Sequence, residues 1–593
     1  MQRVIGEIFS RTERDAYRRA VCAKKRIARA AVLANCKTRK IKLANAYTGA
    51  HTIAAVDTSC LAFVREAEKC RVYASISFAV LLLGIGLPLW WETTAVPRVP
   101  LPYSGISELS QHQLRIHQRL LLGCLEPERS GIFAVEMMSR LTDDGKSDIF
   151  RISLSHFATN NTSIGRAKKM SDLDKAVLGF DLKEGDILVL EAPEALGEDF
   201  VHVTAGRAIY FGSKTDGEKL AMVLRRWLMR DSALSLTRNA LAKPTEFSLD
   251  VENRRRFPAS PNYDILLTIV NPEPENIELD FDVERIARQY IEPFTRELGI
   301  VANFSVKSQS LYMMPLGVKP TKTPDGHYAL SESLLPQIIT PLEKKLASQV
   351  SLYPTVNLVI YVVPCSTAPL HIYLRNGRRH RTNIDLETFH SPRWGGITLV
   401  NPPEEHCLSQ AKAVVPQQQQ RAFQPDEKAI VRVLLTQLRL LLGITNKEPI
   451  EGASIAPLEG LKPRDWELDE LLRIRTVEQL TSAKLTLQSL ARLLRGISNI
   501  VITDTVGDRI NAALKLIEIA TKLLDDADLV RAFLASKEAF CEAEAAFTDP
   551  SLLALLYFPD DQKYAVYIPL FLPVMIPVLF SLKNIKNYLF CSD

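Results

Sequence analysis

The 593-residue chain lacks the motifs on which several common kinds of active site are built. It contains no GxSxG nucleophile elbow, no HExxH zinc motif, no GxxxxGK[ST] phosphate loop and no glycine-rich dinucleotide fingerprint. Its nine cysteines show no CxxC pair or other metal-ligand spacing, and no dense disulfide pattern. The sequence therefore contains no recognisable assembled active site, and no cofactor or metal is expected.

Charge is absent from two long stretches. Residues 72–91 (VYASISFAVLLLGIGLPLWW) and 564–582 (YAVYIPLFLPVMIPVLFSL) contain no Asp, Glu, Lys or Arg. At about 1.5 Å per helical residue, either stretch can cross a hydrocarbon core of roughly 30 Å, so each is predicted to be a transmembrane helix. The alternatives are a cleaved signal peptide for the first and a buried core helix for the second. Trp90 and Trp91 argue against cleavage, because they make a poor cleavage site and suit a membrane interface.

Basic residues are in excess on one side of each stretch. Lys69 and Arg71 precede the first stretch, and Lys583 and Lys586 follow the second. Because an excess of lysine and arginine marks the cytoplasmic end of a span, both termini are predicted to be cytosolic. Residues 92–563 are then expected to lie on the far, lumenal side.

Positive charge is concentrated at the N-terminus. Residues 1–71 contain 16 Lys and Arg against 6 Asp and Glu, whereas the whole chain has a net charge of only +5. The rest of the chain is therefore acidic, and no nucleic acid is expected as a partner. The basic segment is interpreted as a cytosolic tail, a helix on anionic lipid, or a mispredicted start of the reading frame.

The lumenal region changes character near residue 425. Before it, apolar β-rich runs alternate with helical patterns, which predicts a mixed sheet covered by helices on both faces. After it, apolar residues recur every three or four positions, as in packed helices. The strand-like runs are 187–190, 265–270, 356–363 and 397–400, with a helix at 283–298. The predicted fold is α/β, with two transmembrane helices flanking a large lumenal region. Along the chain, the predicted segments are a basic segment 1–71, a first membrane helix 72–91, an α/β domain 92–424, a helical region 425–563, a second membrane helix 564–582 and a cytosolic tail 583–593.

Three groups of residues resemble parts of an active site. Asp280 and Asp282 have the spacing of a carboxylate pair that binds a divalent metal, although Asp282 also suits the N-cap of the following helix. Cys365 and His371 suggest a thiol dyad, but catalytic partners are usually distant in sequence. His390 would be a base beside the segment that follows it. The simpler structural interpretation is favoured for all three.

The segment after His390 contains a proline, an aromatic residue and two adjacent glycines. This composition predicts a tight turn with an aromatic anchor, and a partner interface is the alternative. The residues of this segment are Pro392, Arg393, Trp394, Gly395 and Gly396.

Three prolines interrupt the second apolar stretch at four-residue spacing, namely Pro569, Pro573 and Pro577. This spacing places them on one side of a helix. Each removes a backbone donor and leaves a carbonyl four residues earlier without its usual partner. Since lipid cannot satisfy these carbonyls, a kinked helix packed against neighbouring membrane helices is predicted.

The lumenal region also contains glycosylation sequons and cysteines. Asn-X-Ser/Thr sequons occur at Asn160, Asn161 and Asn303, and Asn303 is expected in a surface loop. An oxidising compartment would allow disulfides, but the sequence does not define their pairing. The cysteines concerned are Cys124, Cys365, Cys407 and Cys541.

Several short blocks of sequence resemble the PIG-S family, the non-catalytic subunits of the GPI transamidase, which attaches glycosylphosphatidylinositol anchors to proteins in the endoplasmic reticulum. The blocks lie between residue 87 and about residue 580. Residues 1–71 exceed the short tail expected for the family, and the match is poor from about 110 to 260. The matching blocks are FHSPRWGGI (389–397), LPLWWE (87–92), LPYS (101–104), NFSVKSQ (303–309), SLYP (351–354), ISNIVI (497–502) and LYFPDDQKYAVYIPLFLP (556–573).

The resemblance implies partners and a location. The partners are the caspase-like catalytic subunit, the other transamidase subunits and the lipid bilayer, with the GPI lipid and the proprotein substrates reached indirectly. The location is the endoplasmic reticulum membrane, with several spans, most of the chain in the lumen, and Asn303 at a glycosylation position of the family. The alternative function, a membrane-tethered lumenal enzyme of sugar or lipid chemistry, would depend on Asp280 and Asp282.

Overall fold

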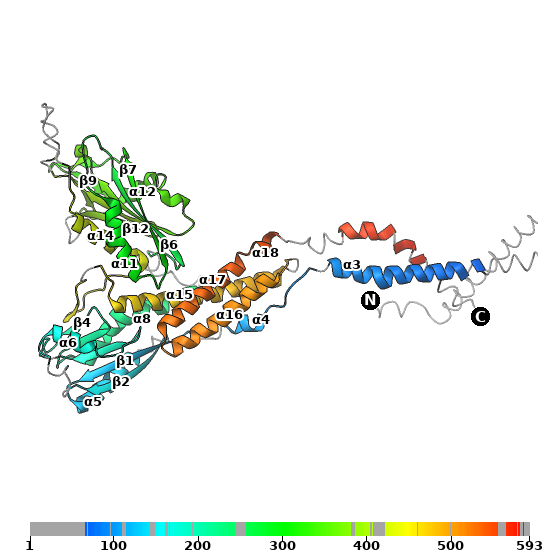
Figure 1. Cartoon of the computed structure of the whole chain (residues 1–593), viewed down its shortest axis with the longest axis horizontal. Helices are drawn as coiled ribbons and strands as arrows, with labels where there is room; N and C mark the ends of the chain where they lie inside the picture. Colours follow the sequence, from blue (N-terminus) through cyan, green and yellow to red (C-terminus); the bar gives the residue numbers. More distant parts are fainter. Residues whose placement is uncertain are drawn as a thin grey trace, which may run out of the picture. The chain divides into compact units, whose positions relative to one another are not determined.

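Two largely parallel β-sheets form the core of the structure, a computed structural model (Figure 1). Both belong to a unit made of Pro100–Arg495 and Asp504–Asp549. A second unit comprises Met1–Val99, Gly496–Thr503 and Pro550–Asp593. The residues described are 66–67, 69–94, 96–109, 114–142, 149–159, 164, 167–192, 194–242, 256–380, 386–403, 406, 422–458, 461–497, 500–554, 565–573, 575–577, 579–580 and 585.

The first sheet has six strands. Their spatial order is β14 (Ala453–Ile455), β4 (Val201–Val203), β5 (Ala208–Phe211), β3 (Ile187–Glu191), β1 (Ile116–Cys124) and β2 (Phe150–Ala158). All neighbours are parallel except β4 and β5. Every residue of β3 is buried, as its continuous apolar run predicts. One face packs on α5 (Pro127–Thr142), α7 (Gly217–Val223) and the π-helix η2 (Leu224–Met229), and the other on α6 (Met170–Val177).

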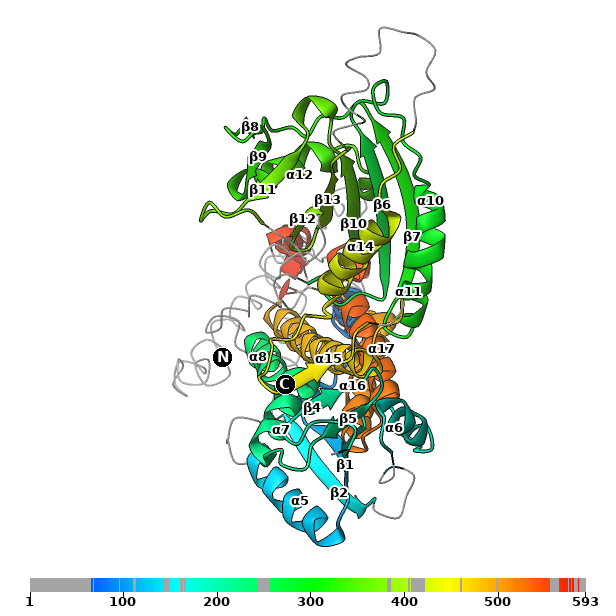
Figure 2. The same cartoon turned by 90° about the vertical axis from the view of Figure 1, so that its left-hand side faces the viewer.

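The second sheet has five strands. Their order is β12 (Glu387–Ser391), β13 (Gly395–Val400), β10 (Thr355–Val362), β6 (Asn262–Asn271) and β7 (Asn303–Tyr312). Only β12 is antiparallel to its neighbour. The core of one face includes α12 (Leu335–Glu343). In Figure 2, α14 (Glu427–Leu442) lies in front of the sheet, beside α10 (Val283–Ile286) and α11 (Glu292–Glu297), which the π-helix η3 (Ala287–Ile291) joins.

The predicted strands and helices of this sheet are therefore present. The Asp426 side chain caps the start of α14, since it accepts a hydrogen bond from Ala429 N, and the helix ends at Gly443, whose φ is 108°. The remaining short elements are β8 (Thr321–Lys322), β9 (Tyr328–Ser331) and β11 (Leu370–Tyr373), which form a small sheet, with α4 (Tyr103–Glu108), α8 (Asp231–Ala242), η4 (Glu332–Leu334), η5 (Ala347–Val350) and η6 (Cys365–Thr367).

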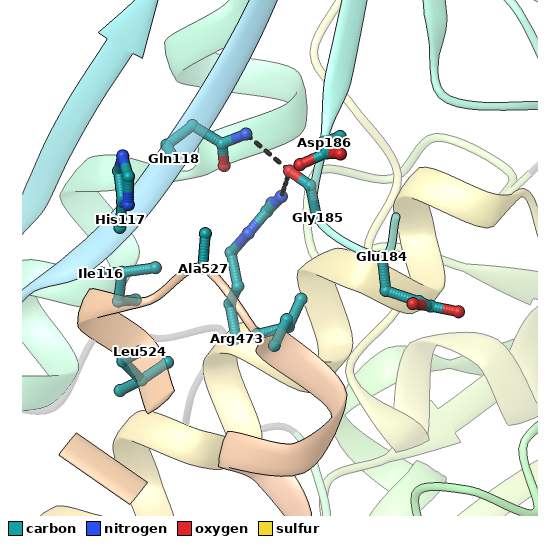
Figure 3. Close-up of a pocket in the computed structure, with 10 residues that line it drawn as sticks. Ile116, His117, Gln118, Glu184, Gly185, Asp186, Arg473, Leu524 and Ala527 are labelled. Carbon is teal, nitrogen blue, oxygen red and sulfur yellow. Dashed lines mark hydrogen bonds between the residues drawn. The ribbon is translucent and has the colours of Figure 1, made fainter. Parts of the chain in front are cut away.

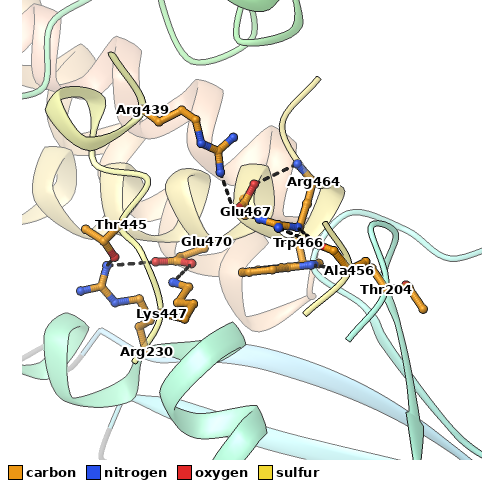
Figure 4. Close-up of polar contacts among 10 residues, drawn as sticks. All are labelled: Thr204, Arg230, Arg439, Thr445, Lys447, Ala456, Arg464, Trp466, Glu467 and Glu470. Carbon is orange, nitrogen blue, oxygen red and sulfur yellow. Dashed lines mark hydrogen bonds and ion pairs between the residues drawn. The ribbon is translucent and has the colours of Figure 1, made fainter. Parts of the chain in front are cut away.

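Buried charges at the start of α15 (Asp465–Gly496) form a hub that bonds to elements of both sheets (Figure 4). Glu467 pairs with Arg439 of α14 and with Arg464, both at 2.7 Å. Burial alone would raise the pKa of the Glu467 carboxyl, but these two arginines hold it below its usual value. Trp466 Nε1 donates to the carbonyl of Thr204, next to β4, at 2.9 Å. The other members of the hub are Arg230, Thr445, Lys447 and Glu470.

Helices follow the hub, as the sequence predicts. α16 (Asp504–Asp525) and α17 (Leu529–Phe547) pack along each other, and α18 (Pro550–Ala554) belongs to the second unit. However, α14 covers the five-stranded sheet and β14 joins the six-stranded one, although both lie beyond residue 425. The change of composition at 425 thus does not separate the sheets from the helices, and the domain boundaries stay predictions.

One described helix, Lys69–Glu92, is long and apolar enough to cross a membrane. It agrees in position with the predicted first span. A π-helix, η1 (Val80–Gly86), precedes α3 (Leu87–Thr94), whose Pro88 cannot donate a backbone hydrogen bond. The second predicted span is helical at 565–573, 575–577 and 579–580. Its other residues lie outside the described ones, so the second span remains a prediction.

Candidate functional site

The order of strands in the five-stranded sheet reverses at β6. From β6 the chain passes through α10 and α11 to β7 on one side, and later returns to β10 on the other. In open α/β sheets, ligands bind beyond the carboxyl ends of the strands at such a switch point. We name the residues there the switch-point cleft: Pro272 and Glu273 after β6, Met313 and Pro315 after β7, and Pro364, Ser366 and Thr367 after β10.

Two cavities occupy this region and share Met313 and Pro315. The first, of about 370 Å³, lies within the switch-point cleft. The second, of about 900 Å³, lies between the end of β7 and α12, and Tyr312 and Met313 at its rim are 64% and 68% exposed. Both linings are mostly apolar. The second is lined by Leu311, Tyr312, Met313, Met314, Pro315, Gly317, Gln337, Thr340, Pro341, Lys344 and Lys345.

The polar groups of the switch-point cleft are few. Ser366 Oγ donates to a carboxylate oxygen of Glu273 at 3.2 Å. Burial and the charge of Glu273 raise the pKa of the Tyr361 phenol, so this hydroxyl stays protonated. Among the described residues that line the two cavities there is no cysteine or histidine. The mostly apolar lining of the cleft is therefore suited to binding an apolar group.

The carboxyl edge of the six-stranded sheet is closed by an ion pair. Glu191, the last residue of β3, is buried and pairs with Arg129 at 2.7 Å. Its other carboxylate oxygen accepts from Leu125 N at 2.9 Å. Cys124 lies beside this pair, and burial, together with the charge of Glu191, raises the pKa of its thiol to about 12. Cys124 is thus a protonated core residue and not an activated nucleophile.

The amino edge of the same sheet contains a small cavity, of about 10 Å³, against α15, α16 and α17 (Figure 3). The carbonyl of Gly185 accepts from Gln118 Nε2 at 2.6 Å and from Arg473 Nη2 at 3.1 Å. A space of this size holds one water at most. The contacts therefore join the helices to the sheet and leave no room for a ligand.

The carboxylate pair predicted as an alternative metal site performs other tasks. Asp282 caps α10, because its side chain accepts from Arg285 N at 2.9 Å, and Asp280 accepts from Gln424 Nε2. Within the described residues, no group of three or more histidine, cysteine or acidic side chains could hold a metal. The N-cap interpretation is confirmed, and the enzyme alternative that depended on this pair is not favoured.

The thiol dyad that Cys365 and His371 suggested, and that was not favoured, does not form. Cys365 belongs to a disulfide, and His371 instead lies against Glu387, with 3.0 Å between its Nδ1 and a carboxylate oxygen. Burial, then the charge of Arg379, lower the pKa of His371. Cys541 is half-buried, and burial raises the pKa of its thiol. Cys407 lies outside the described residues.

Pro392–Trp394 connect β12 and β13 as a hairpin turn, and Gly395 and Gly396 begin β13. Arg393 has a φ of 58°, and the Trp394 carbonyl accepts from both the backbone and the side-chain amide of Asn357, at 3.0 and 3.2 Å. A Cβ atom on Gly395 would lie 1.8 Å from the carbonyl oxygen of Asn357. Glycine is therefore required at this close approach between β13 and β10. His390 belongs to β12 and precedes the turn.

Asn303 and the prolines of the second apolar stretch are not among the residues that line the switch-point cleft. Asn303 is exposed but begins β7 instead of lying in a loop, and Asn160 and Asn161 fall outside the described residues. Pro569, Pro573 and Pro577 are exposed helical residues.

Sequence reasoning did not single out Trp90 as a packing residue. Its ring makes edge-to-face contacts with Tyr567 and Phe571, at centroid distances of 5.7 and 5.3 Å. The clustering of aromatic residues in both apolar stretches was the available signal.

Sequence reasoning also missed the switch-point cleft. Pro272 and Pro364 follow closely on two of the predicted strand runs, so the local signal was present. Which strands are neighbours, and so which of their ends meet, could not be known from the runs alone.

The chain is similar to proteins of GPI-anchor biosynthesis over most of its length. Residues 77–590 match the family model described as "PIG-S: Phosphatidylinositol-glycan biosynthesis class S protein". The chain is 36% identical over 546 residues to the "GPI-anchor transamidase component PIGS" of Bos taurus, a match that covers 86% of this chain and 94% of the relative. It is 25% identical to the "GPI transamidase component PIG-S homolog" of Schizosaccharomyces pombe (90% and 87% covered) and 21% identical to the "GPI transamidase component GPI17" of Saccharomyces cerevisiae (87% and 92%).

Proposed function

The chain belongs to the PIG-S family, and on that premise we propose that it is a subunit of the GPI transamidase complex that supports attachment of GPI anchors without performing the transamidation. The observation that carries this proposal is the 36% identity to a named transamidase component across 94% of that relative. The family model matches residues 77–590, a range that includes most of the apolar helix Lys69–Glu92 and both sheets.

The state of the described cysteines supports a non-catalytic role. Transamidation through an acyl intermediate needs a nucleophile, a base beside it and donors for the oxyanion. Cys124 is a buried thiol with a raised pKa, Cys365 is in a disulfide, and burial raises the pKa of Cys541. The catalytic thiol is then supplied by another subunit, such as the caspase-like one.

The proposed location is the membrane of the endoplasmic reticulum, with two spans and residues 92–563 in the lumen. The apolar helix Lys69–Glu92 and the basic residues outside each apolar stretch support this arrangement. Asn303 is exposed and therefore accessible as a glycosylation site. The lipid bilayer and the other subunits are the direct partners, whereas the GPI lipid and the proprotein are contacted through the complex.

The three prolines of the second apolar stretch are proposed to face partner helices. Pro569, Pro573 and Pro577 are exposed in helical segments, where they leave backbone carbonyls unpaired by the helix itself. Contacts of Trp90 with Tyr567 and Phe571 give this stretch one neighbouring helix within the chain. Neighbours from other subunits would satisfy the remaining groups.

Co-purification tests the proposed function. The tagged full-length chain is expressed in cells that lack their own PIG-S subunit, extracted in mild detergent, and its partners are identified by mass spectrometry. We expect the catalytic and the other transamidase subunits in stoichiometric amounts. The proposal would be contradicted if the chain were recovered alone, with every other subunit at no more than its level in a parallel mock purification.

A further inference from the structure

The strand β7 leaves one side of the five-stranded sheet without a described partner. It is ten residues long and, within the described part of the chain, pairs only with β6. The register of the two strands is continuous from Asn303 to Tyr312, so no bulge interrupts the edge. An edge of this length presents a row of backbone donors and acceptors to any extended chain that approaches it.

Backbone hydrogen bonds to β6 show which N–H groups of β7 point towards β6 and which point away from it. Asn303 N donates to the Pro261 carbonyl and Met313 N to the Asn271 carbonyl, both on the side of β6. Because backbone N–H groups alternate in direction along a strand, the even-numbered residues of β7 point theirs away from β6. The N–H groups of Ser308 and Ser310, whose residues are exposed, therefore face outwards.

Within its own residues, β7 lacks the usual protection of an edge strand. Natural edges are blocked by prolines, by bulges or by lysines that project from the edge. β7 has no proline, and Lys307 is drawn to Asp264, with 2.6 Å between Nζ and a carboxylate oxygen. A glycan on Asn303 would cover only the amino end, about 30 Å from the carboxyl end of the strand.

α12 forms the second wall of a groove along the carboxyl half of β7. Gln309 of β7 bonds to the chain that follows α12, since its Nε2 donates to the Lys345 carbonyl and its Oε1 accepts from Ala347 N, both at 3.1 Å. The 900 Å³ cavity lies in this groove. An edge strand beside a helix is the arrangement in which domains of the PDZ type add a peptide as a further strand.

The groove also indicates the chemistry of its occupant. Leu311, Met314 and Pro341 offer apolar surface to alternate side chains of an added strand. Lys344 and Lys345 line the same cavity, and no described acidic side chain does so. The charge of the groove is therefore complementary to a carboxylate.

We propose that β7 and α12 form a docking groove in which an extended segment of another transamidase subunit, with apolar and acidic side chains, adds as a further strand to the sheet. This inference rests on the proposed function, because it assumes assembly into the complex. It goes beyond that function by naming the surface used and the form of the segment bound.

Hydrogen–deuterium exchange of the full-length chain, alone and within the purified complex, tests the groove. We expect the β7 amides to exchange at least about tenfold more slowly in the complex, because the outward N–H groups gain acceptors. β2, an edge strand of comparable length, is the internal reference and should not change. The inference would be overturned if the β7 amides exchanged equally fast in both states, or if β2 were protected in the complex as much as β7.

Two sets of variants separate the groove from general folding. Ser310→Pro removes one outward donor, and we expect it to reduce recovery of other subunits at least about fivefold, whereas the control Ser310→Ala keeps the donor and full recovery. Lys344→Gln with Lys345→Gln leaves the strand unaltered and should also reduce recovery. Full recovery of the other subunits with both sets of variants would overturn the inference and leave the proposed function standing. Failure of the unaltered chain to recover any other subunit would overturn both.

Discussion

The two parallel sheets of this chain differ most at their carboxyl edges. In the six-stranded sheet, the carboxylate that ends β3, Glu191, is buried and paired with Arg129. In the five-stranded sheet, the corresponding carboxylate after β6, Glu273, accepts a hydrogen bond from Ser366 at the wall of a cavity of about 370 Å³. A similar arrangement of strands thus gives one edge that is closed by an ion pair and one that remains open.

This difference indicates that one edge stabilises the fold and that the other is available for binding. A closed edge with satisfied charges contributes to the fold, since removing either partner leaves a buried group uncompensated. An open edge with apolar walls contributes little to the fold and is available to a partner. We therefore expect substitutions at the first edge to change the stability of the chain and substitutions at the second to change assembly.

The largest effect on stability is expected from Glu191→Ala. This change leaves Leu125 N without its acceptor and Arg129 without its partner, and should lower the free energy of unfolding by about 2–4 kcal/mol. The matched variant Glu273→Ala should change it by less than about 0.5 kcal/mol. Urea titration of the detergent-solubilised chain measures both values. Equal losses would show that the two edges do not differ in the way described.

A smaller loss is expected from Gly395→Ala, which tests whether the five-stranded sheet is open only at its edge. The added Cβ would lie 1.8 Å from the Asn357 carbonyl oxygen, so β13 must move away from β10. We expect a loss of about 1–3 kcal/mol in the same titration. Gly197→Ala is the control and should be nearly neutral, because a Cβ added at Gly197 would meet no other atom within 4 Å. A neutral Gly395→Ala would mean that the interior of this sheet is loose.

The smallest effect concerns how the stability of the chain depends on pH through an ion pair between β6 and the edge strand β7. Burial would raise the pKa of Asp264, but Lys307 and Ser351 donate to its carboxylate and hold the pKa below the usual 3.8. The resulting stabilisation is complete above pH 3.8 and is lost as the pH falls through the lowered value. Because Lys307 is half-exposed, it should amount to less than about 1 kcal/mol. Asp264→Asn should remove this acid-dependent part of the unfolding curve, and an unchanged pH profile would contradict the assignment.

Much of the fold follows from local patterns that the sequence displays. The runs 187–190, 265–270 and 397–400 lie in β3, β6 and β13, and the run 356–363 lies in β10 except for its last residue, because buried parallel strands are continuously apolar. Asp426 and Gly443 end α14 for equally local reasons of capping.

The division into two sheets could not be predicted in the same way. Strand pairing depends on contacts between distant residues, such as those of β14 with β4, some 250 positions apart. The hub at α15 was missed for a similar reason. Glu467 and Glu470 look like a solvated helix face in sequence, and only the distant Arg439 and Arg230 show that they are buried.

The candidate site was predicted less completely than the fold. The hairpin at Pro392–Gly396 and the cap at Asp282 were readable, since turns and caps depend on neighbouring residues. The switch-point cleft was not, because it is made where the ends of three strands meet in space. The glycosylation and proline positions remain predictions.

The most direct test of the account replaces Cys124, Cys365, Cys407 and Cys541 one at a time in cells that lack the endogenous subunit. Cys365, Cys407 and Cys541 are changed to Ser, and the buried Cys124 to Ala, which avoids placing a hydroxyl in the core. Surface display of a GPI-anchored reporter is measured together with the amount of assembled complex. We predict that display follows the amount of complex for every variant. Loss of display from one replacement, with protein level and assembly unchanged, would place a catalytic thiol in this chain and contradict the account.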